Sequence, residues 1–111
     1  MIDEVVVIGD FRLREGANLG EYGRLRGQML DIVTKIEGFQ SAKRYIAEDG
    51  EAINVYRFAS EASLEEWRTH PEHREIMKRG HEEFYDEVHL QICRVIREVN
   101  FQRNEAPGIS V

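Results

Sequence analysis

The densest group of residues that could do chemistry is the segment from Trp67 to Arg74. It holds the only tryptophan of the chain, one of its two prolines and two of its four histidines. Histidine titrates near neutral pH and serves as a general base or a metal ligand. An indole ring packs against planar molecules, and its N–H donates a hydrogen bond. A functional site is therefore expected first in this segment.

The two histidines of this segment, His70 and His73, have the spacing of a metal-binding pair. Residues three apart on a helix project from one face. A protein metal site needs more ligands than two, yet the other histidines lie far along the chain and Cys93 is the single cysteine. We therefore expect no metal site. For His70 the alternative is that it caps a helix beginning at Pro71, which suits a first helical position.

His73 lies on the inward arc of the helix predicted for residues 71–87, together with Met77 and Phe84. Apolar neighbours shift the pKa of a histidine and exclude water, and this environment suits a general base. Two structural alternatives stay open at this point. His73 could be a hydrogen-bonded residue at the edge of the core, and Trp67 could be a core or hinge aromatic.

The elements that must position these residues follow a β-α-β-β-α-β order. Alternating apolar residues predict strands at 4–14, 39–48, 52–59 and 88–100, and apolar stripes predict helices at 19–37 and 71–87. A short helix that opens at Ser60 or Ser63 carries Trp67. Asp49-Gly50 favours a hairpin between the middle strands. This order predicts an α+β, ferredoxin-like fold, a four-stranded antiparallel sheet with helices on one face.

The predicted strands also carry apolar residues on the face that two helices cannot cover. An apolar sheet face of this kind marks an interaction site, and a homodimer packed sheet to sheet is the simplest way to bury it. Residues 1–100 are expected to form one domain, and residues 101–111 a C-terminal tail. Phe101, Ile109 and Val111 of this tail are expected to dock on the partner subunit.

Composition excludes several classes of function. The 15 basic and 21 acidic residues give a net charge of −6 and alternate along the chain, which argues against binding to nucleic acid or to an anionic membrane. No apolar run is long enough to span a bilayer, and the N-terminus lacks a signal sequence. We expect a soluble, cytoplasmic protein. No glycine-rich loop follows a strand, so nicotinamide and flavin sites are unsupported and no cofactor is expected.

Four segments of the chain resemble the antibiotic biosynthesis monooxygenase domain family. They are Phe11–Gly16 at the end of the first strand, Lys35–Phe39 between helix and strand, Tyr56–Trp67, and His70–His73. The resemblance covers about residues 4–98. It implies a dimeric α/β barrel built from ferredoxin-like subunits.

One branch of that family oxidises polycyclic phenols or quinols with molecular oxygen and no bound cofactor. A base deprotonates the substrate in that branch, and the electron-rich anion reduces oxygen. Trp67 matches the tryptophan that lines the pocket there. Ser63 stands where that branch has an asparagine, and His73 where it has a tyrosine, so we take His73 as the candidate for the proton-handling group.

A second branch degrades haem with a first-strand asparagine, this tryptophan and a later histidine. Here the first position falls near Gly9 and the last is Met77, so haem breakdown is the less favoured alternative. A non-catalytic small-molecule-binding dimer is the other alternative. The leading hypothesis is a cofactor-independent monooxygenase acting on a small phenolic or quinol-type aromatic molecule, with His73 and Trp67 as catalytic residues. The residues expected to contact the substrate are His70, Met77, Phe84, Phe11 and Ser63.

Overall fold

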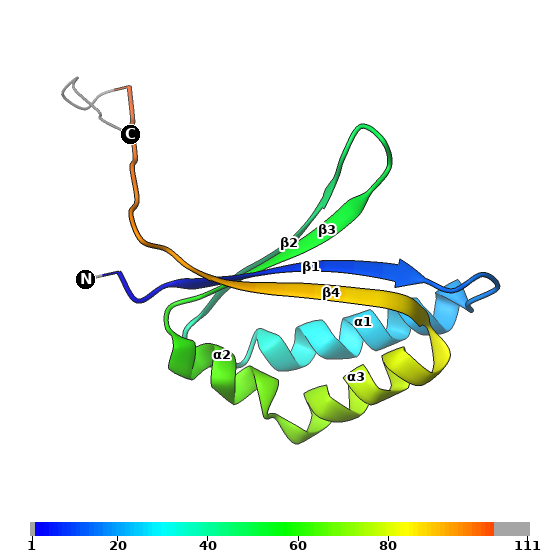
Figure 1. Ribbon diagram of the computed structural model, residues 1–111. Coiled ribbons are helices and arrows are strands. Elements are labelled where there is room, and N and C mark those ends of the chain that lie inside the picture. The colour runs from blue at the N-terminus through cyan, green and yellow to red at the C-terminus, as the bar shows by residue number, and fades with distance from the viewer. Residues whose placement is uncertain (1, 104–111) are drawn as a thin grey trace.

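The computed structural model describes residues 2–103 and has a two-layer α+β architecture (Figure 1). The elements, in chain order, are β1 (Val5–Leu13), α1 (Leu19–Val33), β2 (Phe39–Ile46), β3 (Ala52–Phe58), α2 (Glu61–Arg68), α3 (Pro71–Glu83) and β4 (Tyr85–Arg94). The strands form one antiparallel sheet in the order β2-β3-β1-β4. All three helices lie on one face of this sheet, which confirms the predicted ferredoxin-like fold.

The first helix ends earlier than its apolar stripe predicts. The stripe runs to residue 37, but regular helix stops at Val33. Tighter turns follow, in which the Lys35 N–H donates to the Ile32 carbonyl and the Ile36 N–H donates to the Val33 carbonyl, each at 3.1 Å. Gly38 follows with a φ of +90°, a conformation that favours glycine. A Cβ on Gly38 would lie 2.0 Å from the Ser63 hydroxyl oxygen, so this turn packs directly on α2.

The boundary between the last helix and the last strand was predicted too late in the chain. Helix was expected to residue 87, but α3 ends at Glu83 and β4 begins at Tyr85. Pairing with β1 decides this boundary: Leu13 pairs with Tyr85, and Arg14 N–H donates to the Phe84 carbonyl at 2.8 Å. These long-range backbone bonds outweigh the helix propensity of the acidic run. At its other end β4 stops at Arg94 and not at residue 100.

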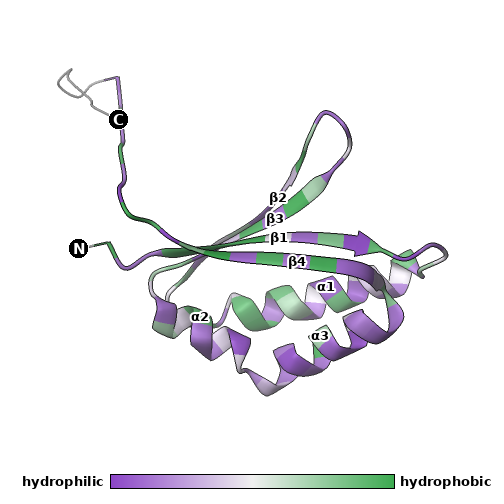
Figure 2. Ribbon diagram, in the orientation of Figure 1, coloured by the Kyte–Doolittle hydropathy of each residue, from purple (hydrophilic) through white to green (hydrophobic). Residues whose placement is uncertain are grey.

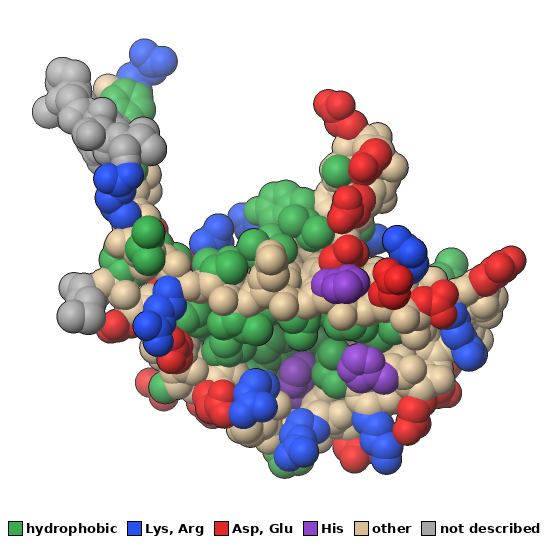
Figure 3. Space-filling model, in the orientation of Figure 1, with side chains coloured by type: hydrophobic (Ala, Val, Ile, Leu, Met, Phe, Trp, Pro, Cys, Tyr) green, Lys and Arg blue, Asp and Glu red, His purple; other side chains and the backbone are tan. Residues whose placement is uncertain are grey.

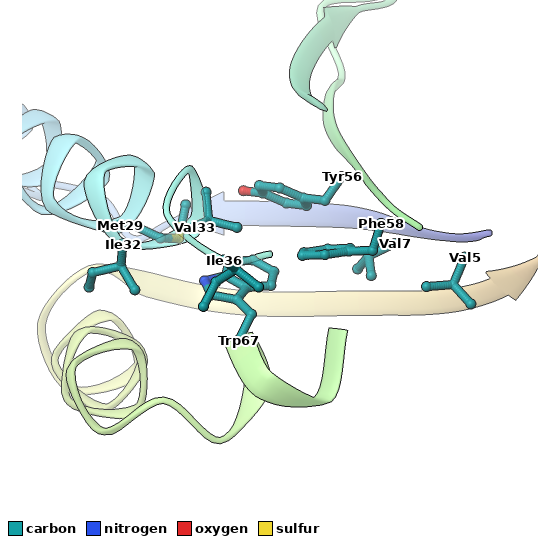
Figure 4. Close-up of a cluster of buried hydrophobic side chains, with 9 residues drawn as sticks. All are labelled: Val5, Val7, Met29, Ile32, Val33, Ile36, Tyr56, Phe58 and Trp67. Atoms are coloured by element: carbon teal, nitrogen blue, oxygen red, sulfur yellow. The ribbon is translucent and has the colours of Figure 1, made fainter. Parts of the chain in front are cut away.

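The core lies between the helices and the inner face of the sheet. Its buried side chains, drawn in Figure 4, are Val5, Val7, Met29, Ile32, Val33, Ile36, Tyr56, Phe58 and Trp67. The helices contribute unequally. Hydrophobic stretches are prominent on α1, whereas α3 is largely hydrophilic (Figure 2), and its only buried residues are His73 and Gly80. The space beside α3 is therefore filled by few apolar side chains.

Candidate functional site

Three helix caps define α2 and its junction with α3. The Ser60 hydroxyl accepts from the Ser63 N–H at 3.2 Å and starts α2. Thr69 ends that helix, and His70 Nδ1 accepts from the Glu72 N–H at 3.2 Å to start α3, with Pro71 in its first turn. Capping groups of this kind satisfy the free N–H groups at helix starts. The alternative reading of His70, a helix cap, is what the structure shows.

This junction brings Trp67, in the last turn of α2, against His73, in the first turn of α3. Their rings are stacked, with centroids 4.2 Å apart and planes inclined by 27°. The indole group also packs against Tyr56 and Phe58 of β3, at centroid distances of 5.1 and 5.4 Å. Trp67 therefore has two roles: it belongs to the hydrophobic core, and its ring stacks on that of His73.

Two polar atoms of this stack are buried without a hydrogen-bond partner among the described residues. They are Trp67 Nε1 and His73 Nδ1. Burial lowers the pKa of His73, and the nearby backbone of Trp67 and Arg68 opposes this shift only in part. A buried polar group without a partner is costly, so these two atoms depart from the usual pairing of polar groups in a protein core. A neutral imidazole can accept a proton or a hydrogen bond there.

An apolar cavity of about 100 Å³ lies beside the stack, between the sheet and the helices. It is lined by Val7, Phe11, Met29, Tyr56, Leu64, Trp67, Arg68, His73, Met77, Leu90 and Ile92. Leu90 and Ile92 belong to the edge strand β4 and are 47% and 60% exposed, so the cavity borders solvent on that side. Figure 3 shows hydrophobic side chains gathered along this opening, with histidine side chains beside them.

The structure brings together four of the seven residues expected to form the site. Trp67, His73, Met77 and Phe11 all line the cavity. His70 lies instead in a separate open groove between α1 and the α2–α3 junction. Ser63 bonds to Ser60 at 3.1 Å between the two hydroxyl oxygens, away from the cavity lining.

Phe84 does not line the cavity either, although it is buried. It packs against Tyr22, with ring centroids 5.6 Å apart, and beneath the Arg79 guanidinium. The helix arc that placed Phe84 beside His73 continued through the end of α3, and the turn into β4 moves it to another cluster. Three of the residues expected to contact the substrate therefore lie outside the cavity lining: His70, Ser63 and Phe84.

Tyr56 of β3 also lines the cavity, although it was not among the residues expected to form the site. Burial raises the pKa of Tyr56 to about 12, and Arg26 opposes this shift, so its phenol stays protonated at neutral pH. Val7 pairs with Tyr56 across β1 and β3, and Val7 also pairs with Ile92 across β1 and β4. This cross-strand register was the signal that would have placed Tyr56 and Ile92 in one row of the cavity wall.

The model of the antibiotic biosynthesis monooxygenase family matches residues 4–79, which hold Trp67, His73 and the first three strands. The chain belongs to the antibiotic biosynthesis monooxygenase family. The resemblance seen in the sequence is thereby confirmed.

One curated protein is similar to this chain in sequence, and solved structures are similar to it in fold, all at low sequence identity. An uncharacterized protein of Bacillus subtilis, YqjZ, is 26% identical over 83 residues, covering 75% of this chain and 73% of YqjZ. Rv0793 from Mycobacterium tuberculosis superposes with a TM-score of 0.72 at 24% identity, covering 86% of this chain and 98% of its own. SnoaB from Streptomyces nogalater, described as a cofactor-independent oxygenase, gives a TM-score of 0.71 at 9% identity, covering 86% and 96% of the two chains.

Among residues 2–103 of this family member, histidine, cysteine, aspartate and glutamate side chains form no group of three or more that could hold a metal ion. In the same part of the chain no helix is both long and apolar enough to cross a membrane.

Proposed function

We propose that this chain is a cofactor-independent monooxygenase that oxidises a small phenolic or quinol-type aromatic molecule with O2. The observation that carries the proposal is the buried His73, stacked on Trp67 at the wall of an apolar cavity, whose Nδ1 has no hydrogen-bond partner among the described residues. Membership in the antibiotic biosynthesis monooxygenase family supports it, as does the fold shared with SnoaB.

The chemistry asks little of the protein beyond proton transfer and a dry pocket. A phenol that loses its proton becomes an electron-rich anion, which can give electrons to O2 directly. One oxygen atom then enters the ring and the other leaves as water, so a phenol and O2 yield a quinone and water. The substrate supplies all the electrons, and the reaction balances without an external reductant.

His73 is the residue proposed to take the phenol proton. Because burial lowers its pKa, the imidazole is neutral at pH 7 and free to act as a base. Trp67, Tyr56 and Met77 form part of the surrounding wall. An apolar wall keeps water from the anion and strengthens every polar contact made inside it.

The size of the cavity limits the substrate. Sites for drug-sized ligands enclose roughly 300–1,000 Å³, whereas this cavity encloses about 100 Å³. We therefore expect single-ring or narrow two-ring phenols to bind first. A larger planar molecule would have to extend past the exposed side chains of Leu90 and Ile92 toward solvent.

The test is O2 consumption with a panel of one- and two-ring phenols and quinols, with product mass measured under labelled oxygen. We expect one labelled oxygen atom per product molecule and at least a 100-fold lower kcat in His73→Gln. His81→Gln is the matched control, because His81 lies on the same helix, is exposed and does not line the cavity.

Three outcomes would contradict the proposal in different ways. A His73→Gln variant as fast as the wild type removes the assigned base. Saturable binding of phenols without O2 consumption favours a non-catalytic small-molecule-binding protein. A haem titration that produces a shifted Soret band favours the haem alternative, for which Met77 replaces the histidine expected in that branch.

We also propose that the protein acts as a homodimer joined through the open face of the sheet. On that face Ile8, Ile53 and Val55 are only half-buried in the single chain, and Tyr45 is 51% exposed. Covering such side chains with a second copy is favourable by about 25 cal/mol per Å² of apolar surface. Phe101, predicted to dock on a partner, is 59% exposed, whereas Ile109 and Val111 lie outside the described residues.

A further inference from the structure

One charged side chain stands in the otherwise apolar wall of the cavity. Among the described residues that line the cavity, Arg68 at the end of α2 is the one with a permanent charge. A guanidinium stays protonated at every physiological pH and loses free energy when it leaves water. Its present partner comes from its own helix: Arg68 Nε donates to Glu65 Oε2 at 2.9 Å, and Arg68 Nη2 donates to Glu65 Oε1. Glu65 itself lies outside the cavity lining.

Arg68 also belongs to the mouth of the cavity. The lining residues that are exposed to solvent are Arg68, Leu90 and Ile92, whereas the others are buried or half-buried. These three residues are here called the mouth. Figure 3 shows basic and acidic side chains beside the hydrophobic opening. A molecule that enters from solvent therefore passes two apolar side chains and one cation.

The ion pair of Arg68 with Glu65 is easily exchanged. The two side chains are 64% and 58% exposed. Ion pairs of this kind stabilise a protein little, because water and salt screen both charges. A carboxylate of a bound molecule can form the same two parallel hydrogen bonds with the guanidinium. It can therefore take the place of Glu65 at low cost.

The size of the cavity brings part of a bound molecule to this arginine. A volume of about 100 Å³ leaves little room beyond a single ring. A substituent on that ring must then extend through the mouth. Its carbon atoms meet Leu90 and Ile92 there, and its end meets the guanidinium of Arg68.

We propose that Arg68 binds a carboxylate of the substrate at the mouth, so that the preferred substrates are phenols with an acidic side chain on the ring. The inference rests on the proposed function and narrows its class of substrates. The phenol ring occupies the cavity with its hydroxyl group toward His73, and the carboxylate replaces Glu65 on Arg68. Arg68 thus determines specificity, while proton transfer stays with His73.

The length of the acidic side chain should matter. A carboxylate joined directly to the ring would have to enter the apolar part of the cavity, where a charge without a partner is costly. Two methylene groups carry the carboxylate outward to the mouth and place apolar carbon atoms against Leu90 and Ile92. We therefore expect 3-(4-hydroxyphenyl)propionate to bind more tightly than 4-hydroxybenzoate.

Isothermal titration calorimetry of the full chain tests this site without relying on turnover. The probes are 3-(4-hydroxyphenyl)propionate, the corresponding amide and 4-hydroxybenzoate. The amide has the same shape but no charge, so the wild type should bind the propionate roughly tenfold or more tightly than the amide. 4-Hydroxybenzoate should bind roughly tenfold or more weakly than the propionate.

Three variants separate recognition from a structural role of the ion pair. Arg68→Gln should remove the preference for the propionate over the amide. Arg24→Gln is the matched control, because Arg24 pairs with Glu21 at the same spacing on α1, at 3.3 Å, and does not line the cavity. Glu65→Gln removes the competing carboxylate and should tighten binding of the propionate roughly two- to fivefold.

Each contrary result has a distinct meaning. Equal binding of propionate and amide by the wild type, or a preference that survives Arg68→Gln, would overturn the carboxylate site. So would weaker propionate binding by Glu65→Gln, because it would show that the pair acts only by stabilising α2. O2 consumption with neutral phenols would then leave the proposed function standing. A preference that depends on Arg68 without O2 consumption would keep the site and contradict the monooxygenase.

Discussion

Two aromatic groups lie in the layer between the sheet and the helices, and they differ in whether their polar atoms have hydrogen-bond partners. The first, here called the Trp67 group, joins Trp67 to Tyr56, Phe58 and His73. The second, the Tyr85 group, joins Tyr85 to Phe11, Tyr22 and Phe84. In the Tyr85 group the hydroxyl of Tyr85 donates to that of Tyr22 at 3.3 Å. In the Trp67 group Nε1 and Nδ1 have no partner among the described residues.

The difference separates a structural cluster from a candidate site. A fully paired polar cluster stabilises the fold, whereas each unpaired buried polar atom costs about 1–3 kcal/mol. The Tyr85 group also fills its space, because a Cβ added at Gly80 would lie 2.5 Å from the Tyr85 ring. The Trp67 group borders a cavity. The two groups meet at Phe11, which touches Tyr85 and also lines that cavity.

The largest expected effect on stability comes from the Tyr85 group. Phe84 is 3% exposed, so Phe84→Ala should lower the free energy of unfolding by about 3–5 kcal/mol. Turnover per folded molecule should stay close to that of the wild type. Urea denaturation followed by circular dichroism measures the first quantity. If the alanine variant does not fold, Phe84→Leu, with an expected loss of about 1 kcal/mol, serves instead.

The opposite pattern is expected in the Trp67 group. His73→Gln should lower kcat at least 100-fold, while the free energy of unfolding falls by only about 1 kcal/mol through loss of the ring stack. Steady-state O2 consumption and urea denaturation of the same preparation give both values. If the His73→Gln variant instead lost kcat only as far as its folded fraction fell, the Trp67 group would be structural like the Tyr85 group, and the distinction between the two groups would fail.

One residue from each group should respond to pH at opposite ends of the scale: His73 at acidic pH and Tyr85 at alkaline pH. Burial lowers the pKa of His73 below 6.5, so the unfolded chain takes up this proton first, and the contribution of His73 to stability is lost as pH falls through its folded pKa. Burial raises the pKa of Tyr85 above 10, so its contribution is lost as pH rises above that value. Urea denaturation midpoints measured across pH test this. His73→Gln should lack the part of the acidic decrease in stability that His73 causes, and Tyr85→Phe should lack the part of the alkaline decrease that Tyr85 causes.

The smallest effect is expected from the hydroxyl pair alone. Tyr85→Phe removes the bond to Tyr22 and should lower the free energy of unfolding at pH 7 by about 0.5–1 kcal/mol. The pair is only partly buried, so Tyr22 can bond to water instead. A loss above about 3 kcal/mol would show that the Tyr85 group depends on this bond more than on packing.

Local signals predicted the fold well because each was strong and consistent. The Asp49-Gly50 turn, the Ser60 cap and the break at His70-Pro71 set the element order, and the order set the sheet. The prediction was wrong where pairing between distant strands decided the outcome. The segment from Tyr85 to Glu87 has the sequence pattern of a helix, and its pairing with β1 makes it strand.

The site was predictable in part for the same reason. Trp67 and His73 are six residues apart, and the caps between them, Thr69 and His70, determine how they meet. Helical spacing also placed Met77 beside His73. Helical spacing alone wrongly extended this face to Phe84, and it gave no information on Leu90 and Ile92, which reach the cavity from the edge strand. That Trp67 Nε1 and His73 Nδ1 have no partner among the described residues depends on tertiary packing, which local sequence patterns do not reveal.

The single tryptophan makes the central claim directly measurable, because Trp67 forms the wall of the proposed site. Titration of its fluorescence with one- and two-ring phenols should give a saturable change for the wild type. The same titration should show at least tenfold weaker binding for His73→Gln and unchanged binding for Tyr85→Phe. No change with any phenol, or equal binding by all three proteins, would contradict the assignment of the Trp67 group as the site.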